Sequence, residues 1–452
     1  MKTVKIYENN VYSRTCDAAL TDVRCERMSA SEGADTPVRV RVCFDRTVFF
    51  PEGGGQSPDT GTVVLKDDPE HPYAVTDVQE QDGLVWHTLE PAERGGQSPD
   101  GRTDPKPGGN DEPGERPALE AGAEATLTID WDHRFDNMQR HLGEHILSGA
   151  FYRLFGAVNK GFHMGDNFMT VDFGFDGDDA GAKRITWEMA MEAELEANRV
   201  IWKDAPVRRD HFDTREEAEK LPLRKHLAFD EDISIITVAD DERVYDCVAC
   251  CGTHPSSAGQ VGLIKILKIE PNKGMSRVYL EAGERAFRLL RKDFDTLYDV
   301  SGRLSAGADD VAKKFDAYVK SADEMKDELY KLKRSVIQSE TEKLLSDGAP
   351  VTIAETGLDA DDIMQITKSL LNGKHSEGGQ PGGRGASDRL FVILSRPACT
   401  AVLCSASGEY DCGAIIKEKA SAFGGKGGGS DKLARAKFDS PERMREFAAS
   451  LS

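Results

Sequence analysis

The sequence lacks three features that would place the protein outside the reducing interior of a cell. It has no run of 18 or more apolar residues, so no membrane-spanning helix is expected. Its first residues, MKTVKIYENNVYSRT, hold no apolar stretch, so no signal peptide is expected. Its nine cysteines are odd in number and spread over 452 residues, which excludes a disulfide framework. We therefore expect a cytoplasmic protein in which clustered cysteines are metal ligands or catalytic groups.

Positive charge is outnumbered by negative charge, with 58 Lys and Arg against 79 Asp and Glu. The formal net charge is −21, which taken alone argues against a nucleic-acid partner, because phosphates are attracted by basic patches. Local patches decide binding, however, and residues 412–437 carry six Lys or Arg against two acids. This segment is locally +4 in a strongly acidic protein.

Large apolar side chains are missing from one internal segment. Residues 91–118 hold six Gly and six Pro in 28 positions, with no aromatic or large aliphatic residue. Such a segment cannot bury a core, so we predict a flexible insertion. The rest of the chain is too long for a single core and predicts two to four domains.

Hydrophobic periodicity predicts a mixture of strands and helices. Strands are predicted at 38–50, over much of 60–90, at 124–130, in M-T-V-D-F-G-F and around I-S-I-I-T-V-A-D. Residues 132–155 have apolar side chains at helical spacing, and a second helix is predicted from a cap at Thr186 to about Arg199. The segments L-I-K-I-L-K-I-E and S-R-V-Y-L-E-A-G predict a β-hairpin across Pro271–Gly274.

The chain from Ala286 onward predicts long helices and then a last α/β domain. Eight residues spaced alternately four and three apart form a heptad seam: Val311, Phe315, Tyr318, Ala322, Met325, Leu329, Leu332 and Val336. This seam suits a coiled-coil hairpin, and equally a long amphipathic helix packed on its own protein. The chain closes with A-F-G-G-K-G-G-G-S-D-K-L-A-R-A-K-F, which predicts a glycine-rich loop entering a helix.

Two short stretches concentrate metal-binding residue types. His141 and His145 are four apart in the predicted helix 132–155, so they share a face and could grip one metal. The stretch D-C-V-A-C-C-G-T-H at 246–254 places Cys250 and His254 four apart across a glycine. Tetrahedral zinc needs three or four N or S ligands, and each stretch supplies two. We therefore predict a Zn²⁺ site made by His141, His145, Cys250 and His254.

Other uses of these cysteines remain open. Cys247-x-x-Cys250 is a competing pair. A redox motif of this kind requires a helix N-terminus that lowers the pKa of a thiol, and no convincing helix is predicted there. A structural zinc knuckle requires a second C-x-x-C, which the sequence does not contain. Cys247 stays the reserve ligand, and Cys251 points elsewhere if Cys250 binds. Four protein ligands would make a closed structural site, whereas catalysis needs a position that yields to water or substrate.

The combination of motifs resembles the free-standing alanyl-tRNA editing proteins of the AlaX type, in their long form. It is also similar to the editing and C-terminal portions of alanyl-tRNA synthetase. The family's H-x-x-x-H helix corresponds to H-L-G-E-H at 141–145, and its C-G-G-T-H loop to C-C-G-T-H at 250–254, with Cys251 in place of glycine. Its upstream signature corresponds to T-V-F-F-P-E-G-G-G-Q, with Thr47 and Gln56. The segment G-G-K-G-G-G-S-D-K-L-A-R-A resembles the DHH-associated domain that ends the long form.

The resemblance implies an α+β fold of four parts. These are a small N-terminal β-barrel at 1–123, a two-layer α/β zinc-containing editing domain at 124–285, a helical or coiled-coil linker at 286–348 and a C-terminal α/β DHH-associated domain at 349–452. The chain opens directly in the editing module, so we expect no aminoacylation core. A homodimer through the coiled coil or the C-terminal domain is a further expectation.

The function implied is hydrolysis, in trans, of the ester between a wrong amino acid and tRNA(Ala). The resemblance implies that Thr47 senses the hydroxyl group of a mischarged serine. It implies that Gln56 holds either the ester carbonyl or the water. A site built to hydrogen-bond an OH discriminates strongly against the analogue that lacks it. The tRNA elbow would be bound by the C-terminal glycine loop and its cations: Gly424, Gly425, Lys426, Gly427, Gly428, Gly429, Lys432 and Arg435.

Two other functions compete with this one. A non-catalytic tRNA-binding protein would keep a structural zinc but would need neither Thr47 nor Gln56. A zinc hydrolase of some other ester would not need the basic C-terminal segment. The sequence does not decide whether serine or glycine is the preferred wrong amino acid.

Overall fold

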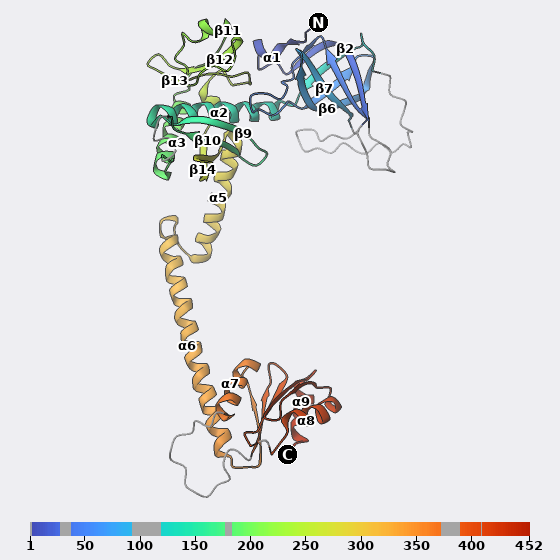
Figure 1. The fold of residues 1–452 in the computed structure, drawn as a ribbon, viewed down its shortest axis with the longest axis vertical. Helices are drawn as coiled ribbons and strands as arrows, with labels where there is room; N and C mark the ends of the chain where they lie inside the picture. The colour runs from blue at the N-terminus through green and yellow to red at the C-terminus, as the bar shows by residue number, and fades with distance from the viewer. Residues whose placement is uncertain (1, 28–37, 93–118, 177–182, 372–388, 408) are drawn as a thin grey trace. The chain divides into compact units, whose positions relative to one another are not determined.

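The computed structural model describes residues 2–27, 38–92, 119–176, 183–371, 389–407 and 409–452 (Figure 1). The insertion predicted at 91–118 lies outside these residues except for its first two positions. Within the described residues, no helix is long and apolar enough to cross a membrane. The chain divides into two compact units, Met1–Leu297 and Tyr298–Ser452. The finer domain boundaries given above stay a prediction.

A closed six-stranded barrel forms the first part of unit 1, as predicted. Its strands follow the order β2 (Thr15–Arg27), β3 (Val38–Phe44), β7 (Leu84–Pro91), β6 (Asp68–Gln81), β5 (Gly61–Leu65) and β8 (Glu124–Ile129). Alternate residues point inward, so that Ala125, Leu127 and Ile129 of β8 are all buried in the barrel core. A short parallel pair, β1 (Val4–Lys5) and β4 (Arg46–Thr47), joins the N-terminus and helix α1 (Ile6–Asn9) to the end of β3.

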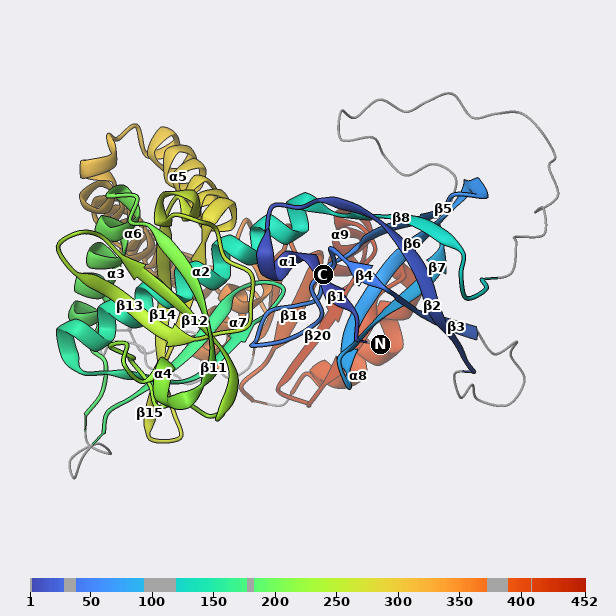
Figure 2. The same cartoon turned by 90° about the horizontal axis from the view of Figure 1, so that it is seen from above.

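Helix α2 (Trp131–Phe155) follows β8 and runs from the barrel into the rest of unit 1 (Figures 1 and 2). It begins where the Asp130 carboxylate accepts hydrogen bonds from the backbone N–H groups of residues 132 and 133, and it ends at Gly156, whose φ of 69° suits glycine. Of the five predicted apolar positions, Met138, Leu142, Ile146 and Ala150 are fully buried, whereas Leu154 near the end of the helix is 39% exposed. From Arg140 to Phe151 the opposite face is buried too.

Two small sheets and a second helix pack around α2. The order β14 (Ile264–Asn272), β15 (Met275–Ala282), β10 (Met169–Gly174) and β9 (Val158–Met164) forms one antiparallel sheet. Helix α3 (Trp187–Trp202) begins at the predicted Thr186 cap and shares the apolar core with α2 and this sheet. The second sheet, β11 (Val207–Thr214), β12 (Glu231–Ala239) and β13 (Val244–Ala249), has its own small core with helix α4 (Arg215–Ala218).

A buried ion pair ties the glycine-rich loop after β4 to the start of α2. Asp59 and Arg134 are both inaccessible to solvent, and Arg134 Nε lies 2.8 Å from Asp59 Oδ1. The guanidinium also donates to the carbonyl oxygens of Val48 and Val11, while Asp59 accepts from the backbone N–H of Phe50. Nearly every donor of Arg134 is therefore used to hold the loop against the helix.

Unit 2 contains a five-stranded sheet. The order is β16 (Val351–Thr356), β17 (Leu390–Ser395), β18 (Thr400–Cys404), β20 (Leu433–Lys437) and β19 (Lys426–Gly429). Two of these strands, β17 and β18, are buried on both faces. Even-numbered residues of β17 pack with helices α8 (Cys412–Lys419) and α9 (Pro441–Ala449), whereas Phe391 and Ile393 pack with α7 (Ala360–Leu371) and the end of α6 (Val311–Ser346). This agrees with the predicted C-terminal α/β class.

The prediction that the glycine-rich segment enters a helix is wrong. Residues 426–429 form the edge strand β19, and residues 433–437 form its hairpin partner β20. In β20 the buried residues Ala434 and Ala436 alternate with the exposed Arg435 and Lys437, which is the period of a strand. The alanines and lysines of this segment have high helix propensity, but pairing with β18 overrides it.

The heptad seam lies on α6, but no coiled coil is confirmed. Most seam residues are exposed, including Tyr318 and Met325 at 63% and 59%. Helix α5 (Gly283–Leu304) ends before the single 3₁₀ turn η2 (Ala308–Asp310) that precedes α6. The helical content was predicted correctly, while the partner of the seam and a homodimer through it stay predictions.

The Asp59–Arg134 pair gives a stability prediction for unit 1. Asp59→Ala leaves the Arg134 charge buried without its partner, so we expect a loss of about 3–5 kcal/mol in the free energy of unfolding. All four tryptophans, at 86, 131, 187 and 202, lie in unit 1, so tryptophan fluorescence during urea unfolding follows this unit alone. The control is Asp17→Ala, which removes an exposed ion pair with Lys66 and should leave the transition in place. Equal transitions for the two variants would contradict the role of the buried pair.

Candidate metal centre

Helix α2 presents two imidazoles on one face. His141 and His145 are one turn apart, and each is 98% buried, with ring centroids 5.1 Å from each other. The i, i+4 spacing places their Nε2 atoms toward the same point beyond the helix surface. The predicted first half of the site is therefore formed by local helix geometry.

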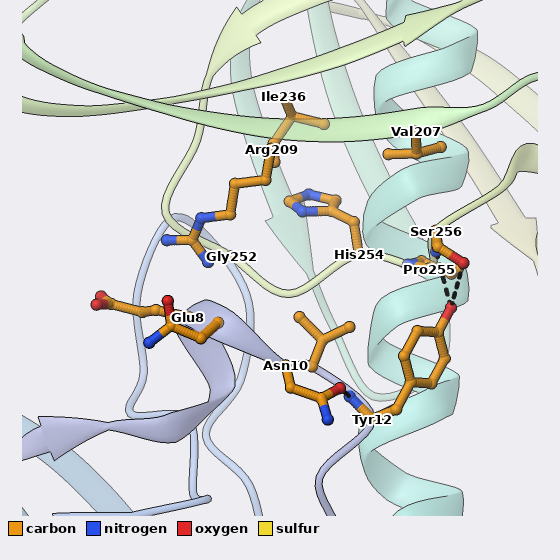
Figure 3. Close-up of a pocket in the computed structure, with 12 residues that line it drawn as sticks. Glu8, Asn10, Tyr12, Val207, Arg209, Ile236, Gly252, His254, Pro255 and Ser256 are labelled. Atoms are coloured by element: carbon orange, nitrogen blue, oxygen red, sulfur yellow. Dashed lines mark hydrogen bonds between the residues drawn. The ribbon is translucent and has the colours of Figure 1, made fainter.

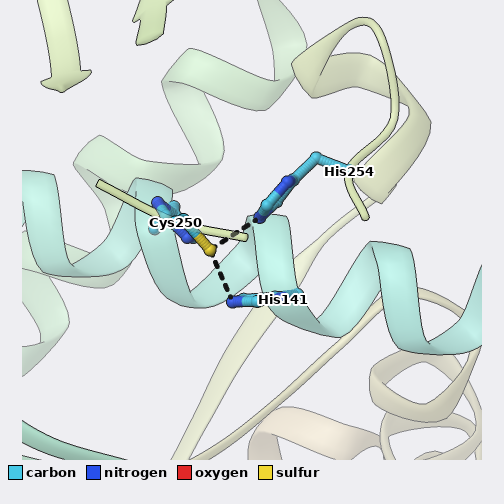
Figure 4. Close-up of side chains that lie close together, drawn as sticks. His141, Cys250 and His254 are labelled. Carbon is cyan, nitrogen blue, oxygen red and sulfur yellow. Dashed lines mark hydrogen bonds between the residues drawn. The ribbon is translucent and has the colours of Figure 1, made fainter. Parts of the chain in front are cut away.

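The loop after β13 brings a thiol and a third imidazole to the same point. The backbone N–H of Cys250 continues the strand pairing by donating to Ser234, and the chain then turns through Gly252. Cys250 Sγ lies 3.4 Å from His141 Nε2 and 3.7 Å from His254 Nε2 (Figure 4). The candidate ligand atoms of His141, His145, Cys250 and His254 all lie within 4.8 Å of one another.

This donor set fits a tetrahedral metal. Bonds of about 2.0–2.1 Å to nitrogen and about 2.3 Å to sulfur place tetrahedral ligand atoms roughly 3.5 Å apart, close to the observed Sγ–Nε2 distances. Three imidazoles and one thiolate are the ligands that zinc prefers in proteins. The predicted four residues are thus brought together and can hold a metal ion.

Hydrogen bonds to the far side of two rings fix which nitrogen faces the cluster. His141 Nδ1 lies 3.0 Å from Gln56 Oε1, and His145 Nδ1 lies 3.2 Å from Asp246 Oδ2. An acceptor at Nδ1 selects the tautomer whose Nε2 lone pair is free for a metal. His254 Nδ1 is buried and has no partner among the described residues.

The charges in the cluster favour metal binding. Burial opposes ionisation of the Cys250 thiol, but the imidazoles of His141, His254 and His145 outweigh it and hold its pKa well below the ordinary value. Burial lowers the pKa of His254 to about 3, which keeps this ring neutral. Burial also opposes protonation of His145, yet the Cys250 thiolate and Asp246 raise its pKa to about 10. A metal that binds here displaces the His145 proton.

Gln56, which the family resemblance implies is a site residue, contacts the cluster through His141. It is fully buried, its Oε1 accepts from the backbone N–H of Thr253, and its Nε2 donates to Thr253 Oγ1 at 2.8 Å. With the bond to His141, both ends of the amide are occupied. The geometry therefore makes Gln56 a positioning residue for His141, while a direct contact with an ester or a water stays a prediction.

Thr47 makes its hydrogen bonds to His87 and Phe49 rather than to the four ligands. Its hydroxyl lies 2.8 Å from His87 Nε2 and accepts a hydrogen bond from the backbone N–H of Phe49. Burial lowers the pKa of His87 to about 4, so the ring beside Thr47 is neutral. No hydrogen bond joins Thr47 to the four ligands within the described part of the chain, and its sensing of a serine hydroxyl stays a prediction.

The two remaining cysteines of the 246–254 stretch lie outside the cluster. Cys247 packs in the small core under β11–β13, with its sulfur 3.6 Å from Thr237 Oγ1. Cys251 is exposed and lies beside the glycines of the loop at 53–54. Of the three cysteines, Cys250 is the one that the structure brings to the histidines, as predicted.

A cleft of about 260 Å³ opens beside His254 (Figure 3). Its walls are the α1 segment from Glu8 to Tyr12, the strands β11 and β12, and the metal-binding loop. Tyr12 closes one end by accepting from the backbone N–H of Ser256, and Arg209 reaches in from β11. The cleft gives a polar route to the edge of the cluster.

Sequence reasoning missed the residues that support the ligands. Asp246 precedes the three cysteines in the sequence and was not predicted as a site residue, yet its carboxylate holds His145 Nδ1. Arg224, 8% exposed, donates from Nε to the same carboxylate at 2.6 Å. A charged pair spaced 22 residues apart carries no local signal. The burial of β13 does not single out Asp246 either, because the four consecutive residues from Tyr245 to Val248 are all buried.

Part of the site region matches a known family of domains. Residues 233–279 match the family described as the threonyl and alanyl tRNA synthetase second additional domain. This stretch contains Cys250 and His254, with the strands β13, β14 and most of β12 and β15 around them. This stretch of the chain, with two of the four candidate ligands, is therefore similar to the second additional domain of these synthetases.

Comparison over the whole chain gives more particular relatives. An alanyl-tRNA editing protein AlaX-L of Pyrococcus horikoshii is 26% identical over 98% of this chain and 97% of its own length. Alanine–tRNA ligases of Methanosarcina mazei and Pyrococcus abyssi are 26% and 27% identical over 90% and 91% of this chain. The chain spans 40% of the length of those ligases. The predicted resemblance to the long AlaX type and to alanyl-tRNA synthetase is confirmed.

The close packing of His141 on Gly252 gives a prediction for metal binding. A Cβ atom at position 252 would lie 2.3 Å from His141 Cε1 and 2.9 Å from Gln56 Oε1, so Gly252→Ala must displace the ring. We expect at least about a tenfold loss of zinc affinity, as for other changes that misorient a ligand, measured by competition with a chromogenic chelator. Gly302→Ala, whose Cβ meets nothing within 4 Å, is the control. Unchanged zinc affinity in Gly252→Ala would show that His141 is not a ligand.

Proposed function

We propose that the protein is a zinc-dependent hydrolase that deacylates mischarged tRNA(Ala) in trans, with serine or glycine as the wrong amino acid. The observation that carries the proposal is the convergence of His141, His145, Cys250 and His254 on one point. It is supported by similarity to an alanyl-tRNA editing protein along nearly the whole chain.

The chain's own residues divide the work at this site. His141, His145, Cys250 and His254 would hold the zinc, which when bound supplies a Lewis acid for an ester oxygen or for water. Gln56 and Asp246 keep two imidazoles in the tautomer that leaves Nε2 free. The cleft of Figure 3 would admit the aminoacylated ribose, with Arg209 and Tyr12 as polar contacts. An aminoacyl ester is activated, so positioning and polarisation are sufficient catalysts.

We place the contact with the body of the tRNA on the β19–β20 hairpin of unit 2. A cavity of about 500 Å³ there is lined by Lys426, Arg435 and Lys437, with Gly427 and Gly428 between them. Because β19 is an edge strand and fully exposed, backbone N–H groups are available for phosphates, as in other glycine-rich sites. The predicted residues Lys426, Gly427, Gly428 and Arg435 fall in this cavity, whereas Lys432, Gly424, Gly425 and Gly429 do not line it.

A second function has one observation in its favour. Four protein ligands within bonding reach of one ion make the closed set typical of structural zinc. A tRNA-binding protein with a structural metal would show the same cluster and the same basic hairpin. The two proposals differ only in whether the ester at the 3′ end of the tRNA is hydrolysed.

The variant His145→Ala, compared with the wild type, distinguishes the hydrolase from the non-catalytic tRNA-binding protein. We expect the variant to lose zinc and to deacylate Ser-tRNA(Ala) or Gly-tRNA(Ala) at less than about 1% of the wild-type rate, because the removed imidazole is a ligand rather than a support. The wild type should spare Ala-tRNA(Ala). His211→Ala removes an exposed imidazole on β11 and should keep both zinc and rate. A zinc-loaded wild type that binds tRNA and hydrolyses none of the three would establish the non-catalytic alternative.

The hairpin assignment is tested by Arg435→Ala. The change removes one cation from the unit 2 cavity, so affinity for tRNA should fall and the salt dependence of binding should weaken by about one phosphate contact. Hydrolysis at saturating charged tRNA should be retained. Arg443→Ala, on the exposed face of α9, is the matched control. Equal tRNA affinity for the two variants would remove the hairpin from the interface.

A further inference from the structure

Unit 1 contains a larger cavity that the metal centre does not use. It measures about 800 Å³ and is lined by Tyr152 near the end of α2, by the start of β9, and by Glu219, Leu221 and residues 223–227. Its polar lining includes Tyr152, Asn159, Lys160, Arg224, Lys225 and His226. None of its lining residues also lines the cleft of Figure 3. The cavity is therefore a separate site on the same unit.

Two buried polar atoms beside this cavity have no partner. Arg224 uses Nε and Nη2 for Asp246, but its Nη1 donates to nothing in the described part of the chain. Asn159 donates from Nδ2 to Glu144 and Ser148, which fixes the orientation of the amide, and its Oδ1 accepts nothing there. Buried polar groups are normally satisfied, and an unsatisfied one costs about 1–3 kcal/mol. One missing acceptor and one missing donor are thus indicated.

The charge around the cavity indicates that the missing acceptor is an anion. Arg224, Lys225 and Lys160 come together from two elements, while the acids of the lining, Asp176 and Glu219, are exposed at the rim. Asp176 pairs with Lys160. Lys225 is half-buried, and burial together with the Arg224 charge lowers its pKa. A bound anion would relieve this repulsion and give Lys225 a partner.

We propose that this cavity binds a ribose phosphate of the single-stranded 3′ end of an RNA. The phosphate accepts from Arg224 Nη1 and Lys225, and a ribose hydroxyl donates to Asn159 Oδ1. The exposed ring of Tyr152 offers a surface on which a base can stack. The inference rests on the proposed function, since it names the part of the charged tRNA that this unit recognises.

The cavity is linked to the metal centre through one carboxylate. Asp246 accepts from Arg224 on one side and from His145 Nδ1 on the other, and it is fully buried. The guanidinium that meets the phosphate is therefore held by the same group that orients a metal ligand. A phosphate placed here has a fixed position relative to the cluster, as an enzyme acting on the terminal ribose requires.

The test measures how tightly the full-length protein binds an uncharged RNA oligonucleotide whose 3′ end is CCA. Binding is measured by fluorescence anisotropy at several salt concentrations. Lys225→Met keeps the apolar stem and removes the charge. We expect Kd to rise about tenfold and the slope of log K against log salt to fall by about 0.7, the value for one phosphate contact with a single strand. The DNA counterpart should bind the wild type more weakly, because it lacks the ribose hydroxyl.

Lys220→Met is the matched control. It removes the same charge from an exposed position five residues upstream that does not line the cavity. Equal Kd and equal salt slope for Lys220→Met and Lys225→Met would overturn the proposal, as would equal affinity of the wild type for RNA and DNA. Because the RNA carries no amino acid, these results do not depend on hydrolysis. Failure of the wild type to deacylate any charged tRNA would refute the proposed function while leaving the binding result readable.

Discussion

The burial of α2 on every side is the constraint around which unit 1 is arranged. From Arg140 to Phe151 each residue of the helix is buried, and five of them are polar or charged. Each of these five meets a partner: Glu281 for Arg140, Gln56 for His141, Asn159 for Glu144 and Ser148, and Asp246 for His145. The partners come from the glycine-rich loop, β15, β9 and β13, so satisfying one helix fixes four other segments.

The sequence allowed the four ligands to be predicted because each half of the site has a local signature. Histidines four apart on a helix, and a cysteine and histidine four apart across a glycine, are patterns that need no knowledge of tertiary contacts. Gln56 was found through the family resemblance, although its observed contacts make it a support of His141. Asp246, Arg224 and Asn159 were not predicted, because pairings between distant segments have no sequence period.

The errors and open predictions have physical reasons as well. Glycine runs carry no side-chain pattern, so the hairpin of residues 426–437 cannot be told from a loop before a helix by its sequence. The seam of α6 was predicted from residue spacing alone. Such spacing predicts a helix with an apolar stripe, but it does not predict which element packs against that stripe. The last part of α6 shows the difference, since Ile337 and Leu344 are buried against the unit 2 sheet.

The carboxylate of Asp246 is shared, and the sharing has an electronic consequence. A carboxylate that hydrogen-bonds an imidazole makes the ring a stronger electron donor, which would leave a bound metal less electrophilic. Arg224 draws on the same carboxylate and thereby limits how much electron density reaches His145. Through these two hydrogen bonds the guanidinium would tune how strongly His145 donates to a bound metal. Occupancy of its free nitrogen would shift that balance, so contact at the cavity would alter reactivity at the cluster without moving an atom of the backbone.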